Sequence, residues 1–118
     1  MAERESLDAD SEERALGEWR HRIDTIDEQL MRLLNSRSAC AVEIGRIKRA
    51  RGLPIYSPER EARILERVMR ENPGPLEPTA VRRVFERIID EARRLERLAA
   101  QSEDSTGLLQ PRESPGKD

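Results

Sequence analysis

The sequence has few of the residues that build a large hydrophobic core. It contains one Trp, one Tyr and one Phe among 118 residues, and its hydrophobic fraction is 36% against a charged fraction of 39%. Such a chain has room for one small domain, and its composition is typical of exposed amphipathic helices. Because one chain has few apolar residues to bury in a core of its own, the composition favours an oligomer whose subunits share a core.

Cysteine is almost absent as well. The single residue, Cys40, excludes an intramolecular disulfide, and its apolar surroundings in the sequence predict a small core residue rather than a nucleophile. The acidic start of the chain has no apolar run that would form a signal or membrane segment. We therefore expect a soluble, cytoplasmic protein without a membrane partner.

The chain also lacks an excess of basic residues. Its formal net charge is -2, whereas nucleic-acid binders usually carry clustered positive charge. Few aromatic side chains are present to stack on bases. The sequence therefore predicts no nucleic-acid partner.

The sequence shows no strand pattern and no internal repeat, and its periodicity predicts an all-α fold. Three helices per chain are expected, one long and two shorter, and they cover roughly residues 16–51, 57–72 and 77–100. Gly52-Leu53-Pro54 ends the first helix. Ser57 is a candidate cap for the second helix, with Pro58 at the first helical position, and Asn72-Pro73-Gly74-Pro75 ends it.

Both ends of the chain are predicted to lie outside the helical domain. Residues 1–13 form an acidic arm that is partly disordered, although Asp10 is a candidate cap for the long helix. Residues 14–100 form the domain. Residues 101–118 form a disordered tail, because Ser, Gly, Pro and charges replace the apolar periodicity there.

The long helix carries an apolar seam that two cations interrupt. Its apolar residues alternate three and four positions apart, the spacing of one helix face. They are Leu16, Trp19, Ile23, Ile26, Leu30 and Leu33. The same count then continues on Arg37, Ala41, Ile44 and Lys48. Burying an unpaired charge is costly, so Arg37 and Lys48 are candidate site residues.

The length of this helix predicts a partner chain. At about 1.5 Å per residue it spans roughly 50 Å, about twice the length of either other helix. A second copy lying antiparallel along it would give an intertwined helical homodimer. Arg20 and Lys48 are about 42 Å apart along one straight helix. They can therefore meet at one small ligand only if Arg20 enters the site of the partner.

Six ionic residues lie on or beside the apolar stripes of the three helices. They are Arg20, Arg37, Lys48, Arg60, Glu61 and Glu96. The four cations among them suit a small dianion, because Arg forks grip carboxylates in pairs and Lys acts as a point charge. Structural ion pairs between helices would produce the same pattern, and periodicity alone leaves both explanations open.

Five segments of the chain form an ordered set with specific spacings. They are WRHRIDTID (19–27), LLNSR (33–37), VEIGRIK (42–48), YSPERE (56–61) and NPGPL (72–76). The set resembles the all-helical (AroQ-class) chorismate mutases, with three segments similar to the first helix, one to the start of the second, and one to a loop of some members. The resemblance covers roughly residues 14–100.

The resemblance implies an intertwined homodimer with two active sites that converts chorismate to prephenate in phenylalanine and tyrosine biosynthesis. The reaction is an intramolecular [3,3] rearrangement, so the resemblance implies no metal and no other cofactor. Some relatives are fused to other shikimate-pathway enzymes or associate with them. Association with such an enzyme is therefore an expectation for this chain.

The resemblance also assigns roles to the ionic residues. The carboxylate-binding residues would be Arg37, Arg60 and, from the partner protomer, Arg20. Lys48 would face the ether oxygen, Glu61 would accept a hydrogen bond from the ring hydroxyl, and Glu96 would approach the ether oxygen from the opposite side. Lys48, Glu96 and Arg37 would be the catalytic residues, and Ser57 would also contact substrate.

Three positions depart from a common version of the family. Glu96 stands where many members have Gln, and a carboxyl group donates a hydrogen bond only when protonated. We therefore predict a raised pKa for Glu96, caused by desolvation and opposed by Lys48, and activity that declines as pH rises. Ser57 and Ala92 stand where some relatives have Asp and Ser. Ser57 can still cap a helix and donate, but Ala92 has no hydroxyl for a carboxylate.

Two other functions fit parts of the same pattern. An isochorismate-pyruvate lyase shares the fold and the cations, although lyases of this kind tend to have an apolar residue at the position of Glu61. A non-catalytic helical dimerisation module would use the interior ions for structure alone. Product analysis with each substrate distinguishes these alternatives.

Overall fold

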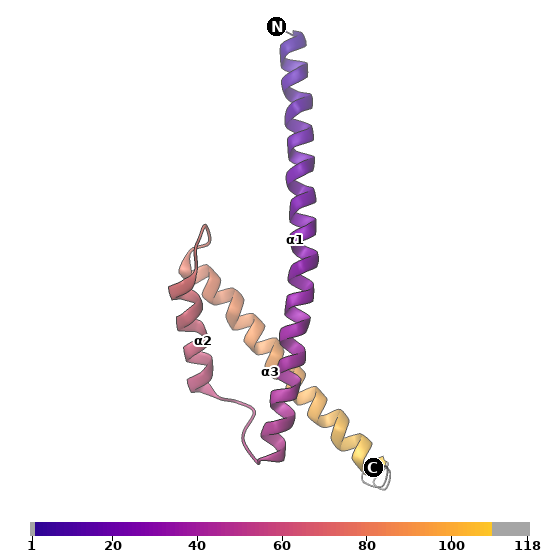
Figure 1. Ribbon diagram of the computed structural model, residues 1–118, viewed down its shortest axis with the longest axis vertical. Helices are drawn as coiled ribbons and strands as arrows, with labels where there is room; N and C mark the ends of the chain where they lie inside the picture. Colours follow the sequence, from indigo (N-terminus) through magenta and orange to yellow (C-terminus); the bar gives the residue numbers. More distant parts are fainter. Residues whose placement is uncertain (1, 110–118) are drawn as a thin grey trace. The chain divides into compact units, whose positions relative to one another are not determined.

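The chain forms three α-helices in the computed structural model, which describes residues 2–109 and the side chains of residues 8–103 (Figure 1). The helices are α1 (Ala2–Ala50), α2 (Pro58–Glu71) and α3 (Pro78–Leu109). Within the described residues no strand is present. The predicted all-α class, with one long and two shorter helices, is confirmed.

Helix α1 begins earlier than the sequence predicted. It starts at Ala2, so Asp10 lies inside the helix and the expectation of a loose arm capped at Asp10 is wrong for the described residues. The reason is local chemistry. Residues 2–13 contain no Gly or Pro, and acidic side chains are favourable near the positive end of a helix.

Helix α1 ends as the glycine and proline predicted. Gly52 has a φ of 69°, the left-handed conformation that glycine adopts without a Cβ penalty. The Leu53 amide donates to the Lys48 carbonyl at 2.7 Å and the Gly52 amide donates to the Arg49 carbonyl at 3.1 Å. These two bonds form a Schellman motif, and they fix the turn that carries the chain from Lys48 toward α2.

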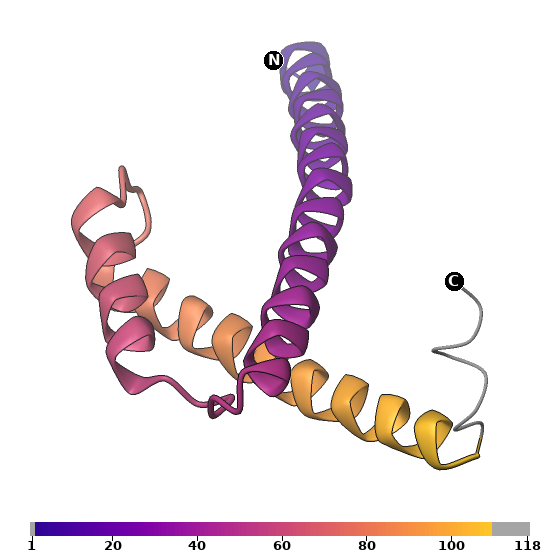
Figure 2. The same ribbon diagram turned by 60° about the horizontal axis from the view of Figure 1, so that its bottom comes forward.

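Helices α2 and α3 pack against each other as a hairpin, and the last part of α1 crosses α3 (Figure 2). Ser57 occupies the N-cap position of α2 with Pro58 following, as predicted, although its side chain makes no capping hydrogen bond. Helix α2 stops at Glu71, where Asn72 is the C-cap. The Glu77 carbonyl accepts from the amides of Ala80 and Val81 and so begins α3.

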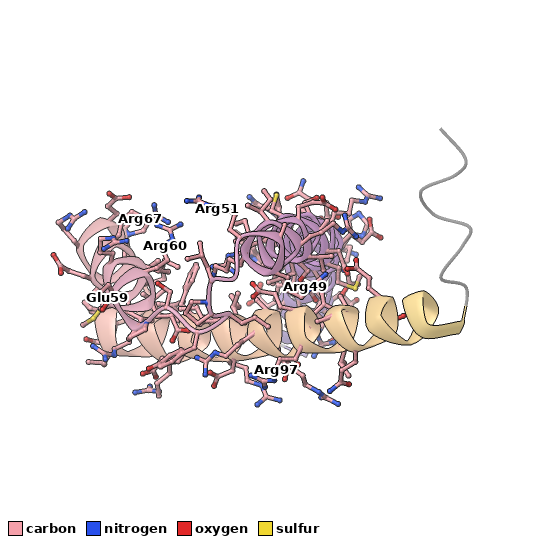
Figure 3. All side chains as sticks on the ribbon, turned by 90° about the horizontal axis from the view of Figure 1, so that it is seen from below. Arg49, Arg51, Glu59, Arg60, Arg67 and Arg97 are labelled. Atoms are coloured by element: carbon pink, nitrogen blue, oxygen red, sulfur yellow. The ribbon has the colours of Figure 1, made fainter. Side chains whose placement is uncertain are left out.

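Helix α3 continues past the predicted end near Ala100 and reaches Leu109. The tail prediction is therefore wrong for residues 101–109, and residues 110–118 lie outside the described residues. Glu103 forms ion pairs with Arg46 and Arg49 of α1, which hold this extension against α1. Figure 3 shows Arg49 between the two helices and Arg97 on the opposite side of α3.

The chain divides into two compact units, one up to Ser36 and one from Arg37 onward. In the second unit, one residue of each helix forms the buried apolar core. These residues are Ala41, Ile64 and Ile89. A core this small is consistent with the low hydrophobic fraction of the sequence.

In the first unit, the predicted apolar seam of α1 is exposed. Its large side chains, from Leu16 to Leu33, have exposed fractions between 43% and 67%. The Trp19 ring contacts the Arg22 guanidinium, whose central carbon lies 4.8 Å from the ring centroid. An apolar row of this length is more than scattered surface residues. None of the described helices is long and apolar enough to cross a membrane.

Candidate functional site

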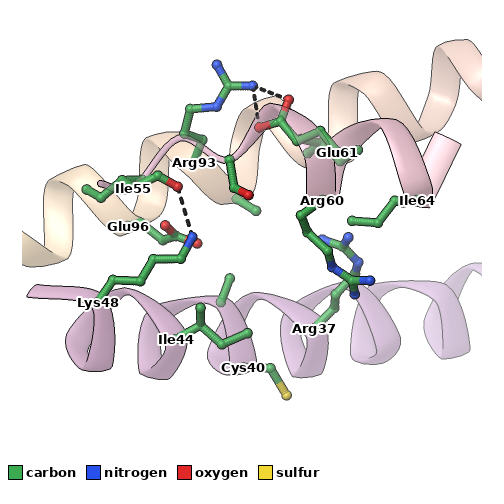
Figure 4. Close-up of a pocket in the computed structure, with 14 residues that line it drawn as sticks. Arg37, Cys40, Ile44, Lys48, Ile55, Arg60, Glu61, Ile64, Arg93 and Glu96 are labelled. Atoms are coloured by element: carbon green, nitrogen blue, oxygen red, sulfur yellow. Dashed lines mark hydrogen bonds and ion pairs between the residues drawn. The ribbon is translucent and has the colours of Figure 1, made fainter. Parts of the chain in front are cut away.

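A pocket of about 230 Å³ lies in the second unit, between the last turns of α1, the α1–α2 loop, α2 and α3 (Figure 4). Six of the residues predicted for the site line it. They are Arg37, Lys48, Ser57, Arg60, Glu61 and Glu96. Apolar side chains, including Ile44, Ile64 and Ile89, fill the space between them. The structure therefore brings together ionic residues that are far apart in the sequence.

The cations occupy two ends of the pocket. In Figure 4, Arg37 of α1 and Arg60 of α2 stand at one end, while Lys48 stands with Glu96 at the other. The Lys48 ammonium donates to the Ile55 carbonyl at 2.9 Å, which fixes its position and leaves two N–H groups for other partners. Two guanidinium groups and a separate ammonium suit an elongated anion with carboxylates.

Glu96 is the buried acidic residue of the pocket, with an exposed fraction of 8%. Burial raises the pKa of its carboxyl above the usual value, while Lys48, Arg93 and Arg49 oppose the rise and Glu61 adds to it. The predicted direction and the predicted opposition by Lys48 are confirmed. A carboxyl group that keeps its proton can donate a hydrogen bond into the pocket, which an ionised one cannot do.

A glycine of α1 makes room for Glu96. A Cβ atom at Gly45 would lie 3.3 Å from Cγ of Glu96 and 3.6 Å from its carboxyl carbon. The absence of a side chain at Gly45 therefore lets the Glu96 side chain lie directly on the α1 backbone. A glycine inside a helix lowers the stability of that helix. The close approach of the Glu96 side chain to the α1 backbone explains why a glycine is present here.

Arg93 also lines the pocket, and the sequence analysis missed it. Its Nη2 donates to both carboxylate oxygens of Glu61, at 2.8 and 2.9 Å. The signal was available, because Ile89, Arg93 and Glu96 are four and three positions apart, the spacing of one helix face. With Arg93, the lining has four cations (Arg37, Lys48, Arg60 and Arg93) against two carboxyl groups.

The two substituted positions, Ser57 and Ala92, also lie in the lining of the pocket. Ser57 has an extended backbone, with φ of -132° and ψ of 90°, and its hydroxyl is not used as a cap. That hydroxyl is free to bond a ligand. Ala92 presents only a methyl group, so it makes no hydrogen bond to a carboxylate.

Two other residues of the sequence analysis lie outside the interior of the pocket. Arg20 belongs to the first unit and does not line the pocket of its own chain, and its entry into the pocket of a partner stays a prediction. Cys40 is exposed, so the prediction of a core cysteine is wrong for the chain by itself. Its side chain lies at the rim of the pocket, where Figure 4 shows the sulfur pointing away from the interior.

The chemistry of the pocket is that of fixed positive charge and hydrogen-bond donors. Among the described side chains, no group of three His, Cys, Asp or Glu residues could hold a metal ion. The site can bind a small anion and order it between two cationic ends, and Lys48 can donate hydrogen bonds to an atom that gains negative charge.

Comparison with known proteins gives one consistent result. Residues 19–97 match the family described as chorismate mutase type II. A structure of chorismate mutase (form II) from Thermus thermophilus has a TM-score of 0.69 and 34% sequence identity, over 70% of this chain and 93% of the other. The match to the family includes every lining residue of the pocket.

Proteins of similar sequence also have chorismate mutase in their names. A bifunctional chorismate mutase/prephenate dehydratase from Stutzerimonas stutzeri is 37% identical over 73% of this chain and 25% of its own length. A chorismate mutase from Methanocaldococcus jannaschii is 40% identical over 45% of this chain and 54% of its own length. The chain thus spans at most a quarter of the bifunctional relatives.

Proposed function

Because the chain belongs to the chorismate mutase type II family, we propose that it converts chorismate to prephenate. The observation that carries this proposal is the pocket itself. Arg37 and Arg60 stand at one end, and Lys48 and Glu96 stand at the other. Chorismate has two carboxylates and an ether oxygen, and a pocket with several cations and hydrogen-bond donors suits such a dianion.

The first catalytic contribution is conformational. Arg37 and Arg60 bind carboxylates of the substrate, and Glu61 accepts a hydrogen bond from the ring hydroxyl. These contacts fold the enolpyruvyl group over the ring, into the conformer from which the new C–C bond forms. Fixing a reactive conformer in advance lowers the entropic part of the barrier.

The second contribution is electrostatic. As the C–O bond breaks, negative charge grows on the ether oxygen. Lys48 donates one hydrogen bond to this oxygen and Glu96 donates another from its protonated carboxyl. These interactions strengthen in the transition state, so they raise the rate of the chemical step rather than only tightening binding. All electrons move within the substrate, and no co-reactant is consumed.

The proposal includes an antiparallel homodimer in which Arg20 enters the pocket of the partner. Its support is the exposed seam of the first unit, whose residues from Leu16 to Leu33 cannot be covered by the small core of one chain. A second copy is the occupant that the seam fits, because the same apolar row on both chains is self-complementary about a two-fold axis. Arg20 lies on this unit.

A partner in the pathway stays a prediction. The names of the bifunctional relatives join chorismate mutase to prephenate dehydratase, an enzyme named for the product of the first. Association with that enzyme would show as a complex on co-purification.

One experiment tests the proposed activity. The purified protein is incubated with chorismate and, separately, with isochorismate, and the products are separated by chromatography. Prephenate from chorismate supports the mutase. Salicylate and pyruvate from isochorismate would identify the lyase, and no product from either substrate would favour the dimerisation module.

A further inference from the structure

Arg93 joins α3 to a pocket residue of α2 and to the α1–α2 loop. Its Nη2 donates to both oxygens of Glu61, and a longer contact of 3.5 Å reaches Asp90. The guanidinium carbon lies 4.8 Å from the centroid of the Tyr56 ring. Figure 4 shows Arg93 and Glu61 joined above the pocket. A carboxylate of α2, a ring of the α1–α2 loop and a cation of α3 therefore form one cluster.

This geometry holds Glu61 without using all of its acceptor capacity. A carboxylate has about four acceptor positions on its two oxygens. A single nitrogen of Arg93 occupies one position on each oxygen, and the remaining positions stay available to a donor in the pocket. Glu61 is thus fixed in orientation and still able to accept a hydrogen bond from a ligand.

Folding stability alone does not explain the cluster. The Nε atom of Arg93 is buried and has no hydrogen-bond partner among the described residues. An unpaired buried donor destabilises the folded state, and a partly buried ion pair contributes little net stability. The side chains of Arg93 and Glu61 have exposed fractions of 27% and 23%, so both are partly removed from solvent.

We propose that Arg93 is a positioning residue that fixes the carboxylate of Glu61 for its hydrogen bond to the substrate hydroxyl and places a positive charge beside Glu96. The inference rests on the proposed function, since it assigns a role at the same pocket. Arg93 acts through Glu61 and Glu96 and does not itself touch the substrate.

The charge beside Glu96 provides a second, independent readout. Glu96 faces Lys48 and Arg49 of α1, Glu61 of α2 and Arg93 of its own helix. The three cations oppose the rise in the pKa of Glu96 that burial causes, and Glu61 adds to the rise. Replacing Arg93 by a neutral residue therefore moves the pKa of Glu96 further up. Activity that needs protonated Glu96 then persists to higher pH.

The test compares Arg93→Leu, Arg93→Lys, Glu61→Gln and the double variant Arg93→Leu/Glu61→Gln in prephenate formation from chorismate across pH. We expect Arg93→Leu to raise KM about tenfold, the equivalent of one charge-assisted hydrogen bond, with a smaller change in kcat. Arg93→Lys keeps the charge but not the planar guanidinium, so its KM should be intermediate. In the Glu61→Gln background, Arg93→Leu should add little.

The matched control is Arg94→Leu, since Arg94 is the next residue on α3 and is exposed. It should leave KM and the pH profile unchanged, and circular dichroism verifies that all variants are folded. If wild-type protein makes prephenate but Arg93→Leu changes neither KM nor the pH profile, or if the effects of Arg93→Leu and Glu61→Gln add independently, the inference is overturned alone. A wild-type protein that makes no prephenate overturns the proposed function and this inference together.

Discussion

Gly45 and Glu96 are in direct contact across the crossing of α1 and α3, because a Cβ on Gly45 would lie 3.3 Å from Cγ of Glu96. This distance is shorter than ordinary carbon–carbon contact. The buried carboxyl of Glu96 therefore depends on the missing side chain of a residue on another helix. The position of the proposed hydrogen-bond donor is set by the packing of two backbones.

We expect Gly45→Ala to lower activity more than stability. Alanine favours the helix by about 1 kcal/mol over glycine, which offsets part of the strain of the close contact. The added methyl group displaces the Glu96 side chain by a few tenths of an ångström. Misplacing a catalytic group in this way should lower kcat about tenfold. Steady-state kinetics and thermal unfolding measure the two effects.

Gly17→Ala is the control for this prediction. Gly17 also lies inside α1, and a Cβ built there has no atom within 4 Å apart from its chain neighbours and the backbone of its own helix. Replacing Gly17 by alanine should also stabilise the helix, and it should not affect turnover. Unchanged kcat in Gly45→Ala would show that Glu96 tolerates displacement or does not act on the substrate.

The pH dependence of turnover should follow Glu96. Its pKa is raised, first by burial, so the protonated form persists above the usual range for a carboxyl group. Activity should be highest below this folded-state pKa and decline as pH rises through it. Glu96→Gln keeps a donor at every pH, so the decline should disappear. A flat wild-type profile that Glu96→Gln leaves unchanged would contradict the assignment.

Glu96 also makes a small contribution to folding stability, and this contribution, like the activity, declines as pH rises. A carboxyl group whose folded-state pKa is raised binds its proton more tightly in the folded than in the unfolded protein. The stabilisation is fully present below the unfolded pKa and is lost as pH rises through the folded pKa. Chemical unfolding of wild type and Glu96→Gln, measured on both sides of this window, should show the difference only in the wild type.

How far the sequence predicted this site depends on the kind of signal each residue carries. Arg37 and Lys48 were identifiable because charges interrupt an apolar seam on one long helix. Glu96 was predicted at the edge of its stripe, and the structure buries it. The burial of Glu96 depends on its contact with Gly45. This contact forms where α1 and α3 cross, so it cannot be deduced from the periodicity of one helix.

Arg93 illustrates the limit most clearly. It follows Ala92, and its partner Glu61 lies 32 positions away on α2. Periodicity places both residues on helix faces, but their pairing depends on how α2 and α3 pack. The ends of α1 and α3 were missed for a related reason. Glu103 pairs with Arg46 and Arg49 only in the folded chain, and no local stop signal separates residues 2–13 from the rest of α1.

Substitution of a pocket cation should distinguish an enzyme from a structural module. We expect Lys48→Ala to lower kcat about 100- to 1000-fold, the usual effect of removing one donor to a developing oxyanion. The protein should remain folded, because Lys48 makes one described hydrogen bond, to the Ile55 carbonyl. Arg51→Ala is the control, since Arg51 is exposed at the end of α1 and is not part of the pocket lining. If the wild-type protein shows no turnover and Lys48→Ala only lowers stability, Lys48 has a structural role instead.

Mixing two inactive variants tests whether Arg20 completes the site of a partner. In an antiparallel dimer, each pocket takes Lys48 from one chain and Arg20 from the other. Arg20→Ala and Lys48→Ala should each be nearly inactive. If they are unfolded and refolded together, about half of the dimers contain one chain of each kind, and each such dimer has one intact pocket. Activity should therefore recover to about a quarter of the wild-type value. Each variant refolded alone is the control. Recovery confined to the mixture requires that Arg20 acts across the interface, whereas a mixture as inactive as its components would restrict each pocket to its own chain.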